Sequence, residues 1–203
     1  MKAFVTSKLP QKIYEKLEKE FILSYHDSNV PLTKEQITSG IKDCEILICP
    51  LSDKIDKDII DSAPNLKLIA NYGAGYDNID IDYAKEKDIV VTNAPAPSSA
   101  VSTAELAFAL MIASARKIVQ GEKNLRQGDF MGWRPTYFLG SQLKDKTLGI
   151  ICMGNIGKNL AKRALAFEMK VIYFSRNRKK GIENENLVYM SKEDVIKNSD
   201  FLS

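Results

Sequence analysis

One stretch, residues 146–177, limits most narrowly what this chain can fold into. A short apolar run rich in β-branched residues, at 147–152, predicts a buried strand. An alanine-rich segment with one apolar side follows at 159–167, and residues 171–174 predict a second strand. A strand, a helix and a strand in so short a stretch form a βαβ unit, which belongs in a parallel sheet.

Two glycines stand where the first of these strands must turn into the helix. Dinucleotide-binding loops read G-x-G-x-x-G, whereas residues 152–157 read CMGNIG, with cysteine in the first position. The unpaired N–H groups and the dipole at the start of the helix attract a pyrophosphate. The alternative is a purely structural turn. We predict a dinucleotide site formed by Met153, Gly154, Asn155, Ile156 and Gly157.

Composition excludes several other classes of protein. The 203 residues suffice for one large or two small domains, and the hydrophobic and charged shares of 44% and 27% are typical of soluble globular proteins. A net charge of +3 predicts no nucleic-acid partner. No apolar run approaches the ~20 residues that a membrane span requires, and no signal peptide is recognisable, so we expect a cytoplasmic protein without a membrane partner. We expect buried free thiols rather than metal ligands at Cys44, Cys49 and Cys152.

The first hundred residues alternate strand and helix signals, which predicts a parallel, doubly wound sheet. Strands are expected at 3–6, 21–25, 45–49, 66–71 and 89–92, with helices beginning at Pro10 and at the capping box of Thr33, and further helices at 56–62 and 80–87.

Ligands of such sheets bind beyond the carboxyl ends of the strands, where two loops attract attention. One follows the strand at 45–49, and the other, residues 72–77, reads YGAGYD. The second loop can present consecutive N–H groups to an anion such as a carboxylate. Equally, its glycines can serve the dihedral angles of a tight turn, and local evidence does not decide between the two.

A proline-containing linker at 93–99 separates this region from a long helix expected at 101–125. The first half of the helix is apolar nearly all round, which indicates burial between domains or against a second subunit. Glu105, within it, is interpreted as a packed or capping carboxylate rather than a catalytic acid.

Several segments together resemble the D-isomer-specific 2-hydroxyacid dehydrogenases, and the resemblance spans the whole chain. The matching segments are NYGAGYDNID at 71–80, TNAPAP at 92–97, STAEL at 102–106, GDFMGWRP at 128–135, KTLGII at 146–151 and MGNIG at 153–157. The GWRP segment and the LSDK loop at 51–54 are most similar to the glyoxylate/hydroxypyruvate reductase branch.

The resemblance implies an α/β protein with a flavodoxin-like parallel-sheet substrate domain at 1–100 and a partial Rossmann coenzyme domain at 101–203. It implies an oxidoreductase that reduces a small 2-keto acid with NAD(P)H, and a homodimer built by the long helix. Thr103 matches a position near the nicotinamide. The substrate site matches Leu51, Ser52, Tyr72, Gly73, Ala74 and Gly75, and backbone amides of the last three residues would hold the carboxylate.

The ribose position bears on the choice of coenzyme. An acidic residue normally binds the ribose 2′-hydroxyl about 20 residues after the glycines. Here Ser175 stands 18 residues after Gly157, followed by Arg176, Asn177 and Arg178. Charge-assisted hydrogen bonds to a 2′-phosphate are worth roughly 1.5–3 kcal/mol each. Ser175, Arg176 and Asn177 therefore predict NADP, with NAD as the alternative, unless the segment is only a solvated basic turn.

The catalytic groups are the open question. The family uses a histidine paired with a glutamate, plus an arginine, supplied after the middle of the coenzyme domain, and the sequence up to Ser203 offers no counterparts. We expect negligible turnover by this chain, an exposed edge at its last strand, and a surface position for His26. Three hypotheses remain open, namely a truncated reductase, a non-catalytic dinucleotide-binding or dimerising fragment, and a non-enzymatic regulator.

Overall fold

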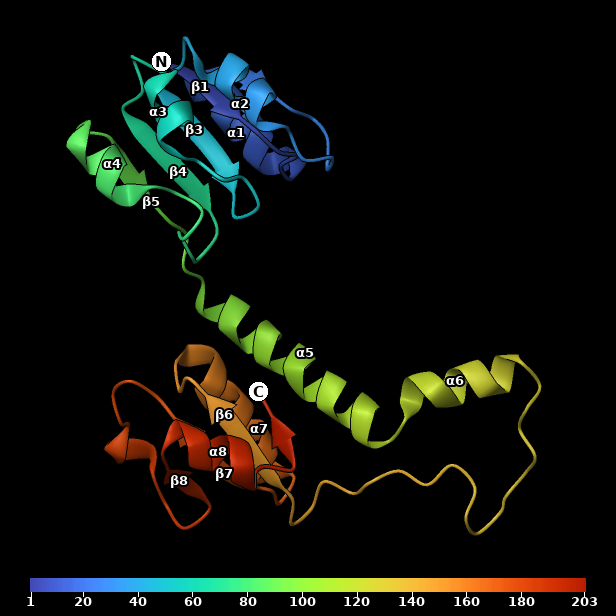
Figure 1. Ribbon diagram of the computed structural model, residues 1–203. Helices are drawn as coiled ribbons and strands as arrows, with labels where there is room; N and C mark the ends of the chain where they lie inside the picture. Colours follow the sequence, from blue (N-terminus) through green and yellow to red (C-terminus); the bar gives the residue numbers. More distant parts are fainter. The chain divides into compact units, whose positions relative to one another are not determined.

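The computed structural model describes residues 1–203 and divides them into two compact units, Met1–Ala96 and Pro97–Ser203 (Figure 1). The boundary between the units falls inside the proline-containing linker, a few residues before the domain boundary expected at residue 100. Each unit has its own parallel sheet and its own hydrophobic core.

The first unit is built on a five-stranded parallel sheet with the strand order β2-β1-β3-β4-β5. This is the flavodoxin-like order, which confirms the predicted fold class. The strands are β1 (Lys2–Val5), β2 (Ile22–Tyr25), β3 (Ile46–Pro50), β4 (Leu68–Tyr72) and β5 (Val90–Thr92), and the helices are α1 (Gln11–Glu20), α2 (Lys34–Ile41), α3 (Lys57–Asp61) and α4 (Ile81–Glu86).

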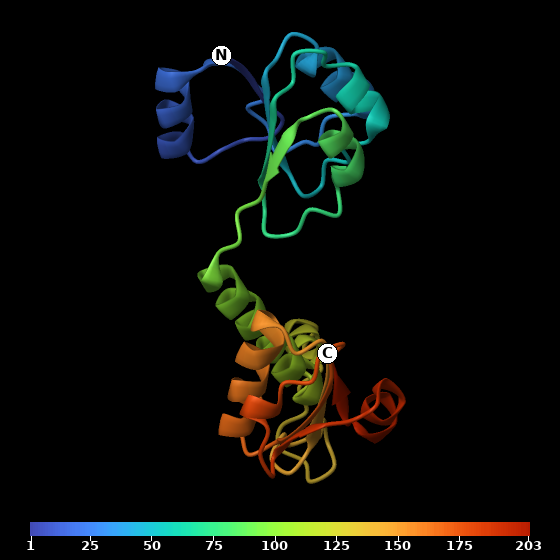
Figure 2. The ribbon, with the colours of Figure 1, turned by 90° about the vertical axis from the view of Figure 1, so that its left-hand side faces the viewer.

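The core of this unit lies on the face of the sheet that α2, α3 and α4 cover, whereas α1 stands on the other side and contributes no buried residue (Figure 2). Leu47 and Ile69, from the central strands, and Ile41 and Ile59, from the helices, are completely buried there. The capping box predicted at Thr33 is present and starts α2.

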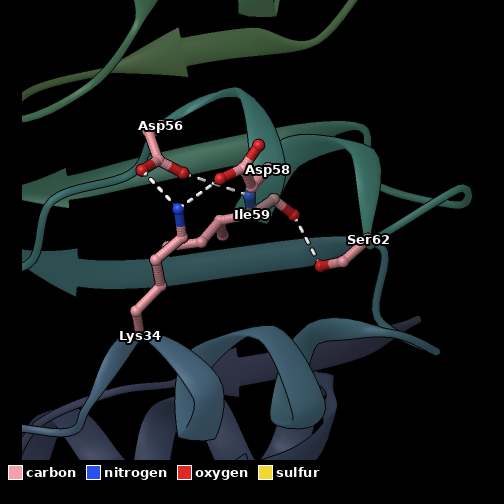
Figure 3. Close-up of polar contacts among 5 residues, drawn as sticks. All are labelled: Lys34, Asp56, Asp58, Ile59 and Ser62. Carbon is pink, nitrogen blue, oxygen red and sulfur yellow. Dashed lines mark hydrogen bonds and ion pairs between the residues drawn. The ribbon is translucent and has the colours of Figure 1, made fainter.

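An ion-paired cluster fixes the starts of α2 and α3 (Figure 3). The Lys34 ammonium lies 2.8 Å from Asp56 Oδ2 and 2.5 Å from Asp58 Oδ2. The side chain of Asp56 also caps α3 by accepting the N–H of Ile59, and the hydrogen bond from Lys34 lowers the pKa of Asp56. The cluster therefore anchors the helix that directly follows the loop after β3.

The second unit holds a four-stranded parallel sheet with the strand order β8-β7-β6-β9. The predicted βαβ unit is present as β6, α7 and β7, and β9 forms an edge of the sheet. Helix α8 and strand β8 were not predicted. The elements are β6 (Thr147–Ile151), β7 (Lys170–Phe174), β8 (Leu187–Tyr189), β9 (Phe201–Leu202), α7 (Asn155–Ala166), α8 (Lys192–Asn198) and the 3₁₀ turn η1 (Lys180–Ile182).

The expected single helix at 101–125 is wrong, because the structure has two helices there, α5 (Pro97–Ala115) and α6 (Ile118–Arg126). Lys117 adopts a left-handed conformation with φ 53°, which ends one helix and starts the next. The carbonyl of Ala115 accepts the N–H of Ser141 at 2.8 Å, so the loop before β6 satisfies the end of α5.

Helix α5 packs along α7 and buries Ala104, Phe108 and Ala115, while Leu106 and Leu110 stay exposed. Contrary to the expectation from the sequence, α5 is long and apolar enough to cross a membrane when judged by length and composition alone. The core helix of a globular domain meets the same criterion, and α5 contributes residues to the core of the second unit.

Candidate functional site

The loop between β6 and α7 leaves several backbone donors unpaired. Gly154 is the N-cap of α7 and supplies no side chain, and the first helical bond runs from Lys158 N–H to Gly154 O at 3.0 Å. The N–H groups of Asn155, Ile156 and Gly157 donate to no acceptor in the protein. Such a helix start attracts a negatively charged group.

The two glycines of the loop serve different physical purposes. A Cβ on Gly157 would lie 2.5 Å from the carbonyl oxygen of Cys152, so only glycine allows α7 to approach β6 this closely. A Cβ on Gly154 would meet no atom within 4 Å, so the space in front of it is open to a ligand.

The replacement of the first glycine by cysteine has a structural consequence. Cys152 has φ 83°, a conformation that favours glycine and is strained for other residues. Its side chain is exposed, which corrects the expectation of three buried thiols. Met153, predicted to bind the dinucleotide, is completely buried, so only its main chain is available.

This loop lies where dinucleotides bind in doubly wound sheets. From β6 the chain moves outward to β7 and β8, and β9 then lies on the opposite side of β6. The order of the strands therefore reverses at β6, and ligands occupy the crevice beyond the carboxyl ends of the strands at such a point.

The ribose segment after β7 presents only part of the predicted basic site. Ser175 is buried to 9% exposure, while Arg176 and Asn177 are exposed. Arg178, by contrast, is already paired, because its Nε and Nη2 donate to the Glu183 carboxylate at 2.9 and 2.6 Å. These hydrogen bonds lower the pKa of the Glu183 carboxyl to about 2. Of the two arginines that follow Ser175, only Arg176 is unpaired.

The remaining predictions for the second unit concern Thr103 and Glu105, which both lie in α5. Thr103 is an exposed residue of α5 whose Oγ1 donates to Ser99 O at 2.8 Å. Glu105 is exposed and forms an ion pair with Arg163 of α7 at 2.6 Å, so it is a paired surface carboxylate rather than a packed one.

In the first unit the structure brings the two candidate substrate loops into contact. Leu51 packs over Gly73, where a Cβ would lie 2.4 Å from Leu51 Cγ. Neither Gly73 nor Gly75 has a positive φ, so the turn-dihedral explanation of these glycines is wrong. Gly73 is needed for the close approach of Leu51, and Ser52 and Tyr72 are exposed beside it.

Buried polar residues that the sequence patterns did not single out stand behind these loops. The Thr6 hydroxyl, just after β1, donates to Asp53 Oδ2 at 2.5 Å, and burial raises the pKa of Asp53. Asn71, at the end of β4, is 3% exposed and bonded to Asn78. The only signal in the sequence is the polar character of residues at the carboxyl ends of the strands.

The remaining cysteines and the single histidine lie outside the two candidate sites. Cys44 and Cys49 are buried, as expected, and burial raises the pKa of the Cys49 thiol to about 12. His26 lies partly exposed after β2, with its Nε2 2.8 Å from Val30 O. No group of three or more His, Cys, Asp or Glu side chains is arranged to hold a metal ion.

A flavodoxin-like sheet followed by a second parallel sheet with a glycine-containing βαβ unit defines a two-domain α/β protein. The family model described as D-isomer specific 2-hydroxyacid dehydrogenase, catalytic domain, matches residues 3–199. The chain belongs to this family.

Relatives of known name agree with this assignment. The chain is 42% identical over 203 residues to a protein assigned as a 2-hydroxyacid dehydrogenase in Staphylococcus haemolyticus, and the match covers 100% of this chain and 64% of that protein. It is 39% identical to a glyoxylate reductase of Pyrococcus horikoshii, with 99% and 61% covered. The chain therefore spans less than two thirds of the length of these relatives.

Solved structures are similar over the same part of their chains. The TT0316 protein of Thermus thermophilus has a TM-score of 0.90 and 35% identity, with 100% of this chain and 63% of that chain covered. The D-lactate dehydrogenase of Aquifex aeolicus, complexed with NAD and lactic acid, has a TM-score of 0.84, 29% identity and coverages of 100% and 59%. An acyclic imino acid reductase in complex with NADPH and D-Arg has a TM-score of 0.81, 29% identity and coverages of 100% and 64%.

Proposed function

We propose that this chain supplies the 2-keto acid site and the coenzyme site of an NAD(P)H-dependent reductase of its family. The observation that carries the proposal is the uncapped start of α7, where three N–H groups in the turn after β6 donate to no acceptor in the protein. Asn155, Ile156 and Gly157 would hold the pyrophosphate there, and Gly154 leaves room for it. When bound, the nicotinamide supplies the hydride.

The proposed substrate is a small 2-keto acid such as glyoxylate or hydroxypyruvate. The similarity to a glyoxylate reductase and the Leu51–Ser52 loop beside Gly73 support this choice. Of the loop amides, Gly73 N–H is already donated to Asn71 O at 2.9 Å. We therefore assign the carboxylate site to the N–H groups of Ala74 and Gly75, together with the N–H group of Tyr76 that follows them.

The proposed coenzyme is NADP, with NAD as the alternative. Because proteins of similar fold bind either NAD or NADPH, the choice rests on residues of this chain. Ser175 offers a hydroxyl, Asn177 an amide, and Arg176 an unpaired guanidinium that can bind a 2′-phosphate. No carboxylate occupies the usual ribose position, where it would repel that phosphate.

Titration of the 203-residue chain with NADPH and NADH, followed by the fluorescence of the reduced nicotinamide, tests this choice. We expect NADPH to bind about tenfold more tightly, since one charge-assisted bond is worth roughly 1.5–3 kcal/mol. Arg176→Ala should lose this preference without weakening NADH, whereas Arg134→Ala, an exposed arginine without an ion pair, is the matched control. Equal affinities for the two coenzymes in the unsubstituted chain would contradict the proposal.

We further propose that the chain on its own binds without turning over, because no histidine, glutamate and arginine of the family pattern are recognisable in it. Its one histidine, His26, lies in the first unit and bonds to Val30 O. The assay is oxidation of NADPH with glyoxylate or hydroxypyruvate by a chain of verified mass. Robust turnover would refute this point, and failure to bind either coenzyme would favour a non-enzymatic regulator.

A homodimer is proposed from the apolar surface of the two helices that precede β6. Large apolar side chains remain exposed on both of them, namely Leu106, Leu110, Ile118, Val119 and Leu125. A second copy that covers these residues would remove them from water. Sedimentation equilibrium should then give twice the chain mass, and Leu110→Lys should shift it toward the monomer. The alternative is a non-catalytic dinucleotide-binding or dimerising fragment, which would dimerise and bind NADPH but would bind no 2-keto acid. The cytoplasmic location and the absence of nucleic-acid and membrane partners remain expectations.

A further inference from the structure

Three successive carbonyl groups of the YGAGYD loop are each held by a donor from the end of β4 or the segment after β5. The carbonyls belong to Gly73, Ala74 and Gly75. Their donors are, in this order, Ala94 N at 2.8 Å, Asn93 Nδ2 at 2.7 Å and Asn71 Nδ2 at 2.7 Å. The orientation of every peptide plane from residue 73 to residue 76 is therefore fixed.

The direction of each carbonyl determines where the next N–H points. In a trans peptide the C=O of one residue and the N–H of the next are antiparallel, and the chain has no cis peptide. The N–H groups of Ala74, Gly75 and Tyr76 must therefore point away from the donors that hold the carbonyls. None of these three N–H groups donates to an acceptor in the protein. Successive unpaired amides of this kind attract an anion.

Asn71 is itself firmly placed. Its side chain is 3% exposed, and its amide exchanges hydrogen bonds with that of Asn78 at 3.1 and 3.3 Å. Asn78 Nδ2 in turn donates to Pro50 O at 3.3 Å and to Asp53 O at 3.0 Å. The paired asparagines thus tie the loop after β3 to the loop after β4.

We infer that Asn71 and Asn93 are positioning residues for the carboxylate of the 2-keto acid. Neither side chain contacts the acid. Asn71 sets the peptide that carries the Tyr76 N–H, and Asn93 sets the peptide that carries the Gly75 N–H. This inference rests on the proposed function and adds the side chains that aim the amides.

Asn93 is the better position for a test because it is exposed, so its truncation should leave the fold intact. The probe is oxamate, an unreactive mimic of a 2-keto acid, titrated into the 203-residue chain and followed by the ¹⁵N–¹H signals of Ala74, Gly75 and Tyr76. We expect these signals to shift in the unsubstituted chain. Asn93→Ala should weaken oxamate binding about tenfold, which corresponds to roughly 1.4 kcal/mol.

Two comparisons separate positioning from a general loss of structure. Asn93→Gln keeps an amide donor and should bind oxamate more tightly than Asn93→Ala does. Asn65→Ala, an exposed asparagine in a turn of the same unit, should bind like the unsubstituted chain. Asn71→Ala is expected to weaken oxamate in the same way, and if it unfolds the protein the Asn93 variants decide the question.

The outcomes for the inference and for the proposed function are distinct. If oxamate does not shift the three amides, or if Asn93→Ala binds within twofold of the unsubstituted chain, the positioning role is refuted. Equal losses in Asn93→Ala and Asn93→Gln would refute it as well. The coenzyme half of the proposed function is tested separately by NADPH binding, which involves the second unit and should not respond to any substitution at Asn93.

Discussion

Gly157→Ala is expected to destabilise the second unit, although glycine-to-alanine changes inside helices usually stabilise by about 0.5–1 kcal/mol. The reason is the close approach of α7 to β6. The new Cβ would lie 2.5 Å from Cys152 O and 3.3 Å from Ile150 Cγ2. The first of these is a backbone atom of the residue that directly follows β6, so it cannot turn aside as a side-chain atom could.

The magnitude follows from the balance of two effects. Overpacking of a rigid site costs about 1–3 kcal/mol, and the upper end applies where the clash is with backbone. Subtraction of the helix gain of up to about 1 kcal/mol leaves a net loss of roughly 2 kcal/mol. That loss corresponds to about a 30-fold increase in the opening equilibrium of the unit.

Gly154→Ala is the matched control variant. Gly154 has φ −81° and ψ −160°, which alanine adopts without strain, and its Cβ would meet no atom within 4 Å. We expect a change in stability of at most about 1 kcal/mol, from the weaker N-cap. The methyl group would, however, stand where a phosphate approaches, so NADPH should bind more weakly.

Hydrogen exchange of the β6 and α7 amides measures the stability of the second unit without interference from the first. NADPH fluorescence measures the affinity of the same variants. An unchanged exchange rate in Gly157→Ala would show that the reasoning about helix–strand approach is wrong. An unchanged NADPH affinity in Gly154→Ala would show that no phosphate lies there.

Three further substitutions test other contacts. Gly73→Ala would place its Cβ 2.4 Å from Leu51 Cγ and displace that side chain, so oxamate binding should weaken while the melting temperature of the first unit changes little, and unaltered binding would count against the site. For Glu183, hydrogen bonding to Arg178 lowers the folded pKa from 4.5 to about 2, so its stabilising contribution is present above pH 4.5 and is lost as the pH falls toward 2. Glu183→Gln should therefore show a smaller loss of urea resistance between pH 6 and pH 3, as measured by circular dichroism. For Asp53, burial raises the pKa of the carboxyl group in the folded state. Its contribution to the stability of the fold is therefore present below the pKa of the unfolded state and is lost as the pH rises through the pKa of the folded state. Asp53→Asn should be more resistant to urea than the unsubstituted chain at pH 7, with a smaller difference near pH 3, and the reverse order would refute the assignment.

Much of the fold was predictable because its signals are local. Apolar β-branched runs gave β6 and β7, and the Thr33 capping box gave the start of α2. The break at Lys117 was not predictable, because neither glycine nor proline marks it. Helix α8 and strand β8 were missed because they are short and their patterns are weak.

Some features of the candidate site were likewise predictable from the sequence, and others were not. The positions of Gly154 and Gly157 followed from their spacing after a strand. The engagement of Arg178 with Glu183 and the exposure of Cys152 depend on how the chain returns past the ends of β6 and β7, which spacing does not encode.

By itself, the sequence determined the family, the class of fold and the two loops proposed to bind ligands, because glycines, strand runs and helix starts are properties of neighbouring residues. Only the tertiary structure decided how those loops are held. Asn71 and Asn93 hold two carbonyls of a loop whose next N–H groups then point away from these donors. Donors and acceptors on different strands meet only after the order of the strands in the sheet has brought them together.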